Sequence, residues 1–318
     1  MDTKLRGVDF GPVWTAAGAC GFFGEGYWFH HLPFGPNFKR ATLVSKTTTT
    51  HPRKGNMKLT DDHRPKHLFP DSVWMDWREG IVLNATGLSN PGAEALFLTG
   101  HWQKLRKPLL ISYMAVAPTG RQRMLETEQF TVICKKYLPT IKAPIGLQIN
   151  FSCSNCGVDI APIREEINES LHILGTLDIP LVPKFNLEMP PEMAAEIAQY
   201  PVCDAICQTN AIHWRAMANK IDWDGLFGKN AESPLKKYGG GALSGKPLLP
   251  LLHDWTQQAR RAGLRKPINA GGGILSLDDA DYVFAAGADS IFLGSAGFLR
   301  PWRVAEIVRE TNSYNFFE

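Results

Sequence analysis

Five polar side chains that could bind a ligand or take part in catalysis stand at the ends of short apolar runs. They are two lysines and three asparagines: Lys46, Asn84, Asn150, Lys184 and Asn210. Lysine and asparagine are rarely buried without a partner, so packing alone does not explain five of them at corresponding positions. Lysine brings a positive charge, and asparagine brings paired donors and acceptors. The set therefore predicts a site for a planar, anionic ligand that carries amide groups.

A cysteine, Cys153, lies three residues after the asparagine that ends one of these runs. A thiol there could be a nucleophile, a base, a metal ligand or a small buried apolar group. Cys156 completes a Cys-x-x-Cys pair with it, which leaves a zinc site and a dithiol redox pair open as alternatives. A second pair, Cys203 and Cys207, is spaced one residue too widely for this motif and falls at an expected strand, where side chains alternate between faces. We therefore expect no metal site.

The elements that must position these residues alternate between short apolar runs and longer helical patterns. The strand candidates are 41–46, 80–84, 109–114, 145–150, 181–185, 205–209, 267–270 and 290–294. The helix candidates are 91–105, 121–137, 162–175, 190–200, 247–263, 277–287 and 301–311. Continuous apolar runs are typical of strands buried on both faces of a parallel sheet, so the order predicts a (β/α)₈ TIM barrel or a doubly wound sheet. Active sites of such barrels lie at the carboxyl ends of the strands, where the five polar side chains fall.

Glycine-rich turns favour the barrel over the doubly wound sheet. No Gly-x-Gly-x-x-Gly motif follows the first expected strand, whereas Gly271-Gly272-Gly273 follows the seventh and Gly294-Ser295 follows the eighth. Barrels commonly bind a phosphate after these two strands, because exposed backbone N–H groups meet there at the start of a helix. The alternative is that the glycines only make tight turns.

Length and composition limit the class of protein. The 318 residues include 34 basic and 31 acidic side chains, so the net charge is only +3. This balance argues against nucleic acid or an anionic membrane as the main partner. No apolar run approaches the ~18 to 20 residues that a membrane helix needs, and the first ten residues do not resemble a signal peptide. With only six cysteines, we expect a cytoplasmic protein with reduced thiols.

Residues 1–318 are expected to form a single domain. Two long polar segments, at about 51–79 and 215–240, are expected as insertions over one end of the barrel. The first 25 residues could form a hairpin that closes the bottom of the barrel or a lid at the other end.

Taken together, these motifs resemble the dihydroorotate dehydrogenase family of flavin enzymes. The similarity runs from about residue 9 to 305, with the motifs in the family's order. They are Gly11–Gly18, Val44-Ser-Lys46-Thr47, Pro52–Asn56, Leu83–Asn90, Asn150–Asn155, Lys184, Thr209-Asn210, Gly241–Gly245, Gly271–Ile274 and Gly294-Ser295. The resemblance implies a barrel with non-covalent FMN at its mouth.

It also implies FMN-dependent oxidation of dihydroorotate to orotate, in pyrimidine and UMP biosynthesis, with Cys153 as the base and Lys46 as a second catalytic residue. The residues implied to bind substrate are Lys46, Asn84, Gly87, Leu88, Asn150, Asn155 and Asn210. Those implied to bind FMN are Ala16, Ala17, Gly18, Lys46, Thr47, Asn150, Lys184, Gly245, Gly272, Gly273, Gly294 and Ser295. Charge beside the ring is the kind of tuning that a protein supplies to a flavin.

Three features depart from the family pattern. Ser154 replaces the usual proline after the cysteine, Ala211 replaces a usual hydroxyl residue, and residues 57–79 are longer than expected. A flavin oxidoreductase acting on another dihydropyrimidine, a related cyclic amide or an activated alkene therefore stays open. So does an inactive barrel that serves as a binding module.

The cysteine base points to the soluble class of the family. That class includes enzymes that reduce a small acceptor such as fumarate and enzymes that pass electrons to an iron–sulfur partner subunit. The sequence leaves both acceptors open. We expect a homodimer and no nucleic-acid or membrane partner.

Overall fold

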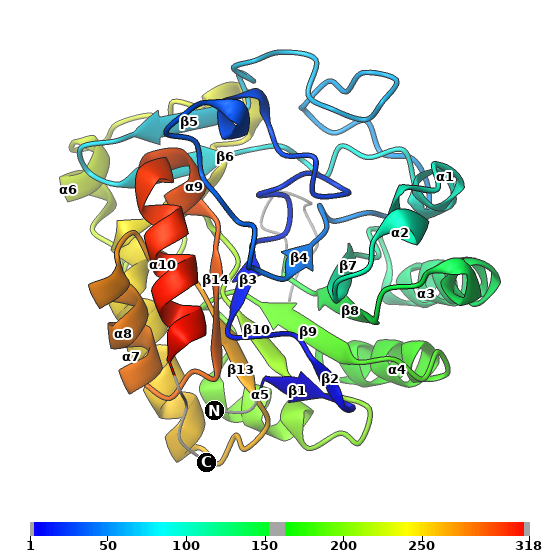
Figure 1. Ribbon diagram of the computed structural model, residues 1–318. Helices are drawn as coiled ribbons and strands as arrows, with labels where there is room; N and C mark the ends of the chain where they lie inside the picture. The colour runs from blue at the N-terminus through cyan, green and yellow to red at the C-terminus, as the bar shows by residue number, and fades with distance from the viewer. Residues whose placement is uncertain (1–2, 153–162, 315–318) are drawn as a thin grey trace.

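A closed barrel of eight parallel strands forms the centre of the computed structural model, which describes residues 3–152 and 163–314 (Figure 1). The strands are β3 (Val13–Thr15), β4 (Leu43–Val44), β7 (Leu109–Tyr113), β8 (Ile145–Asn150), β9 (Leu181–Phe185), β10 (Ile206–Gln208), β13 (Ile268–Ala270) and β14 (Ser290–Leu293). Their order is β3-β14-β13-β10-β9-β8-β7-β4, and a parallel bridge between Trp14 and Thr42 joins the two ends. The predicted (β/α)₈ barrel is confirmed.

One expected barrel strand belongs to a different sheet. Residues 80–84 form β6 (Ile81–Asn84), which pairs antiparallel with β5 (Val73–Asp76) and β12 (Ala242–Gly245). β11 (Ile212–His213) completes this second sheet of four strands. The first barrel strand is instead β3, inside the first 25 residues. The prediction failed because β6 is apolar and buried like a barrel strand, whereas three-residue β3 is too short to show a pattern.

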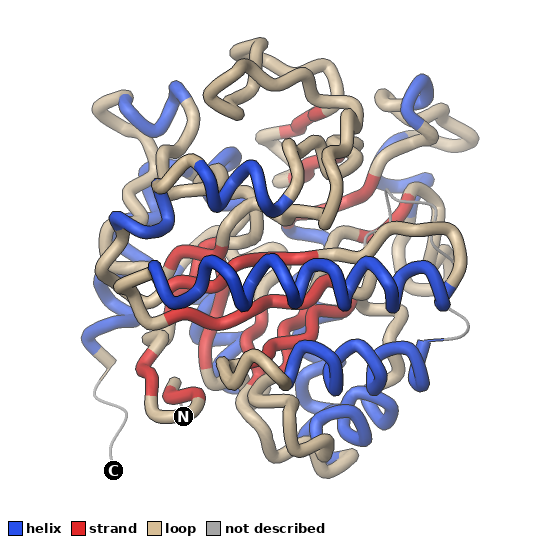
Figure 2. Tube along the Cα trace, turned by 90° about the vertical axis from the view of Figure 1, so that its right-hand side faces the viewer, coloured by secondary structure: helices blue, strands red, loops and turns tan. Residues whose placement is uncertain are grey.

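Helices cover the outside of the barrel, and Figure 2 shows the longest of them, α3, in front of the strands. In chain order the helices of the structure are α1 (Ala93–Leu98), α2 (His101–Lys104), α3 (Gly120–Tyr137), α4 (Ile163–Gly175), α5 (Pro191–Ala198), α6 (Trp223–Phe227), α7 (Leu249–Arg261), α8 (Leu277–Ala285), α9 (Ser295–Leu299) and α10 (Pro301–Ser313), of which α6 lies over the mouth rather than on the outside. Short 3₁₀ turns are η1 (Trp28–His31), η2 (Leu138–Thr140), η3 (Lys236–Tyr238) and η4 (Lys246–Leu248). The expected helix at 91–105 is two helices, because Gly100 takes a left-handed conformation between them.

The amino-terminal hairpin closes the bottom of the barrel. Its strands β1 (Lys4–Leu5) and β2 (Val8–Asp9) pair antiparallel, and Arg6 forms an ion pair with Asp204 at 3.0 Å. Leu5 and Phe10 are buried against barrel-interior side chains that include Trp14. These apolar side chains fill the bottom of the barrel. The polar side chains of the site lie at the other end.

Two insertions lie over that other end, the mouth of the barrel (Figure 1). The segment 51–79 supplies β5, and the segment 215–240 supplies α6. They contact each other through a Lys237–Asp71 ion pair at 2.6 Å and through the rings of Trp74 and Phe227, 5.8 Å apart. The mouth therefore has a roof, made of the antiparallel sheet and these two segments.

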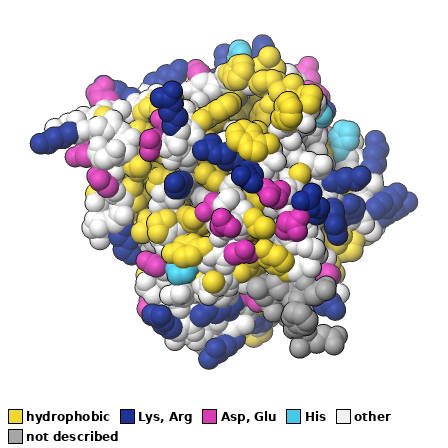
Figure 3. Space-filling model, turned by 60° about the vertical axis from the view of Figure 1, so that its left-hand side comes forward, with side chains coloured by type: hydrophobic (Ala, Val, Ile, Leu, Met, Phe, Trp, Pro, Cys, Tyr) yellow, Lys and Arg dark blue, Asp and Glu magenta, His cyan; other side chains and the backbone are white. Residues whose placement is uncertain are grey.

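The surface in Figure 3 mixes Lys and Arg with Asp and Glu, and hydrophobic side chains gather near its top. This mixture fits the small net charge of +3. Within residues 3–152 and 163–314, no helix has the length and apolar character needed to cross a membrane.

Candidate active site

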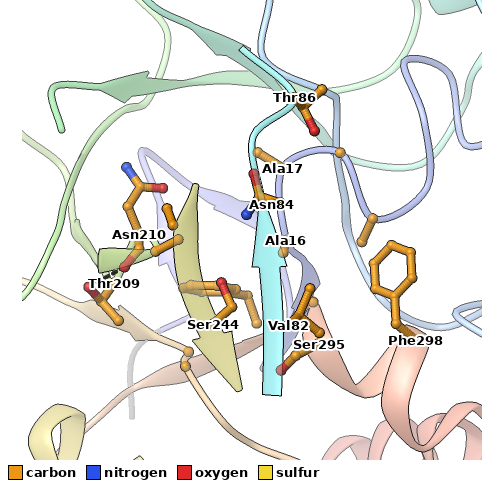
Figure 4. Close-up of a pocket in the computed structure, with 18 of the residues that line it drawn as sticks. Ala16, Ala17, Val82, Asn84, Thr86, Thr209, Asn210, Ser244, Ser295 and Phe298 are labelled. Carbon is orange, nitrogen blue, oxygen red and sulfur yellow. Dashed lines mark hydrogen bonds between the residues drawn. The ribbon is translucent and has the colours of Figure 1, made fainter. Parts of the chain in front are cut away.

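A cavity of about 260 Å³ lies between the carboxyl ends of the barrel strands and the antiparallel sheet (Figure 4). It is lined by every expected site residue that the structure describes. These are Ala16, Ala17, Gly18, Lys46, Thr47, Asn84, Gly87, Leu88, Asn150, Lys184, Asn210, Gly245, Gly272, Gly273, Gly294 and Ser295. Cys153 and Asn155 lie outside the described residues. Segments far apart in the sequence thus meet in one pocket.

Asn84 reaches the cavity from the roof rather than from a barrel strand. It ends β6, two residues after Val82, so both side chains lie on the same face of that strand. Ser244 of β12 pairs with Val82, and Figure 4 shows these three residues on the two neighbouring strands. The expectation that Asn84 follows a barrel strand was wrong. The pocket instead holds amide groups on opposite walls, one from the roof and others from the barrel.

Lys46 follows β4 and is buried, with 9% of its surface exposed. Its Nζ donates a hydrogen bond to the Ser89 carbonyl oxygen at 2.5 Å and lies 4.9 Å from the centre of the Phe22 ring. Burial lowers the pKa of Lys46 to about 8, and the negative charge of Glu25 opposes this shift. The ammonium is thus a buried cation poised near neutral pH, which suits binding and stabilising an anion.

Lys184 brings a second buried cation to the floor of the cavity. It lies on β9 with 4% of its surface exposed, and its Nζ is 4.5 Å from the centre of the Phe292 ring. Thr47, which follows β4, also lines the cavity, and its hydroxyl contacts the Ser112 hydroxyl at 2.8 Å. Two lysines held inside the barrel mouth favour a negatively charged ligand, because each pays a desolvation cost that an anion offsets.

Asn150 and Asn210 form a hydrogen-bonded pair beside this floor. Asn210 Nδ2 donates to Asn150 Oδ1 at 2.6 Å and to Ser152 Oγ at 3.1 Å. The Ser152 N–H in turn donates to Asn150 Oδ1 at 3.2 Å. These bonds fix the orientation of both amides and join Ser152, the last described residue before Cys153, to two residues that line the pocket. Oriented amides of this kind can recognise the edge of a cyclic amide.

The loop after β6 is held by the first insertion. Gly87 and Leu88 line the cavity with φ angles of 67° and 56°. Arg53 Nε donates to the Gly87 carbonyl oxygen at 3.0 Å, and Asn56 Nδ2 donates to the Ala85 carbonyl oxygen at 2.7 Å. The segment 51–79 therefore does more than cover the mouth, since it fixes the backbone that faces the ligand.

Glycines form the end of the cavity near β12, β13 and β14. A Cβ atom added at Gly245 would lie 2.1 Å from the Gly80 carbonyl oxygen, and one at Gly273 would lie 2.6 Å from the Gly245 carbonyl oxygen. A Cβ at Gly294 would lie 2.8 Å from that of Ala16. Backbone therefore packs directly on backbone here, beside the first residue of α9, Ser295. This arrangement fits the phosphate of a cofactor such as FMN.

The described cysteines form no pairs. Cys203 and Cys207 are free, buried thiols that belong to different hydrophobic clusters, and burial raises the pKa of each to about 12. Among the residues that the structure describes, no group of three His, Cys, Asp or Glu side chains could hold a metal ion. Cys153 and Cys156 lie outside that part of the chain.

Several lining residues were not expected from the sequence. They are Tyr27, Val82, Ser244 and Phe298, among others. Val82 could have been found from Asn84, because residues two apart in a strand share a face. The position of Ser244 follows from the antiparallel pairing of β12 with β6, which no local sequence pattern predicts. Tyr27 and Phe298 come from a loop and a five-residue helix without a periodic signal.

A parallel (β/α)₈ barrel whose mouth holds two buried lysines, oriented amides and a glycine-lined end is typical of enzymes that bind a phosphate-bearing ligand there. The sequence profile of the dihydroorotate dehydrogenase family matches residues 1–314. The chain belongs to this family of FMN-dependent oxidoreductases.

Relatives of two kinds cover nearly the whole chain. It is 27% identical over 316 residues to the catalytic subunit of dihydroorotate dehydrogenase B (NAD⁺) from Thermoanaerobacter pseudethanolicus, which covers 95% of this chain and 89% of that protein. It is 26% identical over 310 residues to dihydroorotate dehydrogenase A (fumarate) from Lacticaseibacillus paracasei, with coverage of 94% and 92%.

Solved structures agree on the fold. The crystal structure of DHODH from Eimeria tenella in complex with ferulenol matches with a TM-score of 0.68 at 17% identity, covering 97% of this chain and 82% of that chain. The ligand-free form matches with a TM-score of 0.65.

Proposed function

We propose that this protein catalyses the FMN-dependent oxidation of dihydroorotate to orotate, a step of pyrimidine and UMP biosynthesis. The observation that carries the proposal is the single cavity that brings together Lys46, Lys184, the Asn150–Asn210 pair and Asn84. Dihydroorotate is a cyclic amide with a carboxylate, and its product orotate is planar, so the pair needs oriented amides and a positive charge. The cavity supplies the amides from Asn84, Asn150 and Asn210 and the positive charge from Lys46 and Lys184.

FMN, when bound, supplies the acceptor for the hydride that leaves the substrate ring. We assign its phosphate to Gly245, Gly272, Gly273, Gly294 and Ser295, and its ring to the wall formed by Ala16, Ala17, Gly18, Thr47 and the two lysines. The buried ammonium of Lys46 stabilises negative charge that develops in this region, and its low exposure keeps water from weakening that effect.

The substrate lies between FMN and the amides in this proposal. Asn84, Gly87 and Leu88 bind it from the roof, while Asn150 and Asn210 bind it from the barrel side. Asn155 is proposed to complete the set. The hydrogen bonds among Asn150, Asn210 and Ser152 hold the amides before substrate arrives, which lowers the cost of ordering them on binding.

Cys153 is proposed as the base that takes the proton from the carbon next to the hydride donor. The reaction removes one hydride and one proton from neighbouring ring carbons, so a proton acceptor is required on the face away from FMN. Ser152, the residue before it, is buried and bonded to Asn210 at the pocket rim. A thiol has a reference pKa of ~8.5, so a modest downward shift gives thiolate near neutral pH.

A second candidate substrate, another dihydropyrimidine or an activated alkene, is favoured by one observation. Ala211 lines the cavity where a hydroxyl residue would give the substrate one more hydrogen bond. The electron acceptor is proposed to be a small molecule such as fumarate or an iron–sulfur partner subunit, because relatives of both the A (fumarate) and the B (NAD⁺) type match.

We further propose that the chain is a single domain and that it forms a homodimer in the cytoplasm. We also propose that it has no membrane or nucleic-acid partner, and the small net charge of +3 supports this last point. Mass measurement of the native protein in solution tests the oligomeric state. A monomer at micromolar concentration would contradict the homodimer.

Rapid-mixing reduction of the FMN-loaded protein by dihydroorotate tests the assignment of the base. Cys153→Ala should bind FMN and orotate but reduce the flavin at least ~100-fold more slowly. Cys153→Ser should regain part of the rate at high pH, because a hydroxyl is a much weaker acid. Cys156→Ala is the matched control and should be almost as fast as the wild type. Equal losses from both alanine substitutions would favour a metal or disulfide role for the pair.

A further inference from the structure

The loop between β3 and β4 carries a carboxylate close to the buried lysine of the site. We propose that Glu25 is a positioning residue for Lys46: it folds this loop so that the Phe22 ring lies against the ammonium, and its carboxylate brings a negative charge to the Lys46 side of the site. The inference deepens the proposed function. It rests on that function only where it assigns Lys46 a role toward substrate and FMN.

The Glu25 carboxylate holds the loop through two backbone bonds. Its Oε1 accepts from the Phe22 N–H at 3.0 Å, and its Oε2 accepts from the Phe23 N–H at 2.7 Å. The carboxylate also packs closely on Gly21, where an added Cβ would lie 2.1 Å from Glu25 Oε1. Gly21 has a φ of +77°, which favours glycine. Any side chain at position 21 would therefore collide with the Glu25 carboxylate.

This folded loop contacts Lys46 at both its backbone and its side chain. The Lys46 N–H donates to the Gly21 carbonyl oxygen at 2.8 Å. The Phe22 ring, 1% exposed, lies 4.9 Å from Lys46 Nζ. An ammonium over an aromatic face is attracted to it, and the attraction is larger where water is excluded. Glu25 thus acts on Lys46 through Gly21, which its carboxylate contacts, and through Phe22, whose N–H donates to it.

Charge gives the second part of the effect. Burial lowers the pKa of Lys46, and Glu25 raises it. Among the residues that the structure describes, the other titratable groups of this region are Cys20 on the loop, and Tyr27 and Lys184 on the walls of the cavity. Cys20 and Tyr27 stay neutral at pH 7, because burial and the Glu25 charge raise their pKa values. Lys184 is a cation and cannot help Lys46 to keep its proton, so removing the Glu25 charge should let Lys46 lose it at lower pH.

The direct test is a titration of Lys46 in the apoprotein, which needs neither FMN nor activity. Protein labelled with ¹³C-lysine is followed by NMR, and the Lys46 Cε signal is assigned from its absence in Lys46→Arg. The wild-type Lys46 pKa is expected at about 8. Glu25→Gln should lower it, whereas Glu25→Asp, which keeps the charge, should give a higher value than Glu25→Gln. Glu128→Gln, the same change at an exposed position on α3, should leave it unchanged.

An unchanged Lys46 pKa in Glu25→Gln overturns the inference. If Glu25→Gln does not fold, Phe22→Leu is the second variant, because it keeps the carboxylate but removes the ring from the ammonium. It should also lower the pKa, and an unchanged value would overturn the proposed route through Phe22.

Orotate binding to the FMN-loaded protein gives an independent readout. Wild-type affinity should fall as pH rises through the Lys46 pKa, and Glu25→Gln should move this fall to lower pH. An affinity loss of the same size at every pH would mean that Glu25 only stabilises the loop, which overturns the charge effect. A wild-type protein that binds neither FMN nor orotate would instead contradict the proposed function, while the lysine titration would still stand.

Discussion

The side-chain amide of Asn210 donates a hydrogen bond to the side-chain oxygen of Asn150 at 2.6 Å, although 60 residues separate them in the sequence. Asn150 ends β8, and Asn210 follows β10, with β9 between the two strands. The bond therefore spans one strand of the barrel mouth. It gives both amides a fixed orientation at the place where we put the substrate.

Substitution of this pair should weaken orotate binding in a non-additive way. Asn210→Ala removes one ligand contact and one partner of Asn150, which should cost about 1 to 3 kcal/mol, or roughly 5- to 150-fold in affinity. The double variant with Asn150→Ala should lose less than the sum of the single losses, because the residues share a bond. Titration of the flavin absorbance with orotate measures both. Strictly additive losses would mean that the residues act independently.

FMN retention should depend on Gly245. In Gly245→Ala the new Cβ would meet the Gly80 carbonyl oxygen at 2.1 Å, so the end of the cavity must open. We expect the variant to purify with little FMN and with a lower unfolding temperature. Gly263→Ala is the matched control, since φ is +92° there and +108° at Gly245, but nothing lies within 4 Å of its Cβ. Equal FMN content in both variants would argue against a phosphate site beside Gly245.

Lys46 should make the apoprotein less stable at neutral pH than at alkaline pH. Its folded pKa, about 8, lies below the ordinary lysine value of 10.5, so the unfolded chain binds more protons between these values. The free energy of unfolding therefore rises with pH in this window, and the penalty is full below about pH 8. Lys46→Met should stabilise the apoprotein at pH 7 by about 1 to 3 kcal/mol.

Urea unfolding at several pH values between 7 and 10.5 measures this difference. The advantage of Lys46→Met should shrink as pH rises. A difference that does not change with pH would mean that Lys46 titrates at its ordinary pKa in the folded protein.

Ala211 tests the identity of the substrate. A hydrogen bond contributes about 0.5 to 1.5 kcal/mol, so Ala211→Ser or Ala211→Thr should leave orotate affinity unchanged or raise it by about tenfold at most. Orotate titration of each FMN-loaded variant gives the result. If either substitution abolishes binding while the protein stays folded, the pocket is shaped for another ligand.

The strand–helix alternation together with the late glycine-rich turns predicted the barrel, and the residues at apolar-run ends predicted five of the side chains in its pocket, while the other expected lining residues came from the family resemblance. Local patterns could not reveal the partner of each strand. The run Ile81–Asn84 is as apolar as a barrel strand because it is buried within the roof. Only its pairing with β5 and β12 shows that it is not a barrel strand. Val13–Thr15 is too short for a period-two signal.

Contacts within the pocket were equally hidden from the sequence. Lys46 was expected there, but its neighbours Phe22 and Glu25 belong to a glycine-rich loop without regular structure, so their positions follow from tertiary packing. Likewise, no sequence spacing predicts the hydrogen bond between Arg53 and Gly87, because it joins the 51–79 insertion to the separate loop after β6.

The visible spectrum of the purified protein, recorded before and after anaerobic addition of dihydroorotate, tests the central claim most directly. The account predicts a yellow protein with about one FMN per chain, whose flavin absorbance bleaches as about one orotate forms per flavin. A colourless protein that cannot be reconstituted with FMN would contradict the account. So would bound FMN that dihydroorotate leaves oxidised.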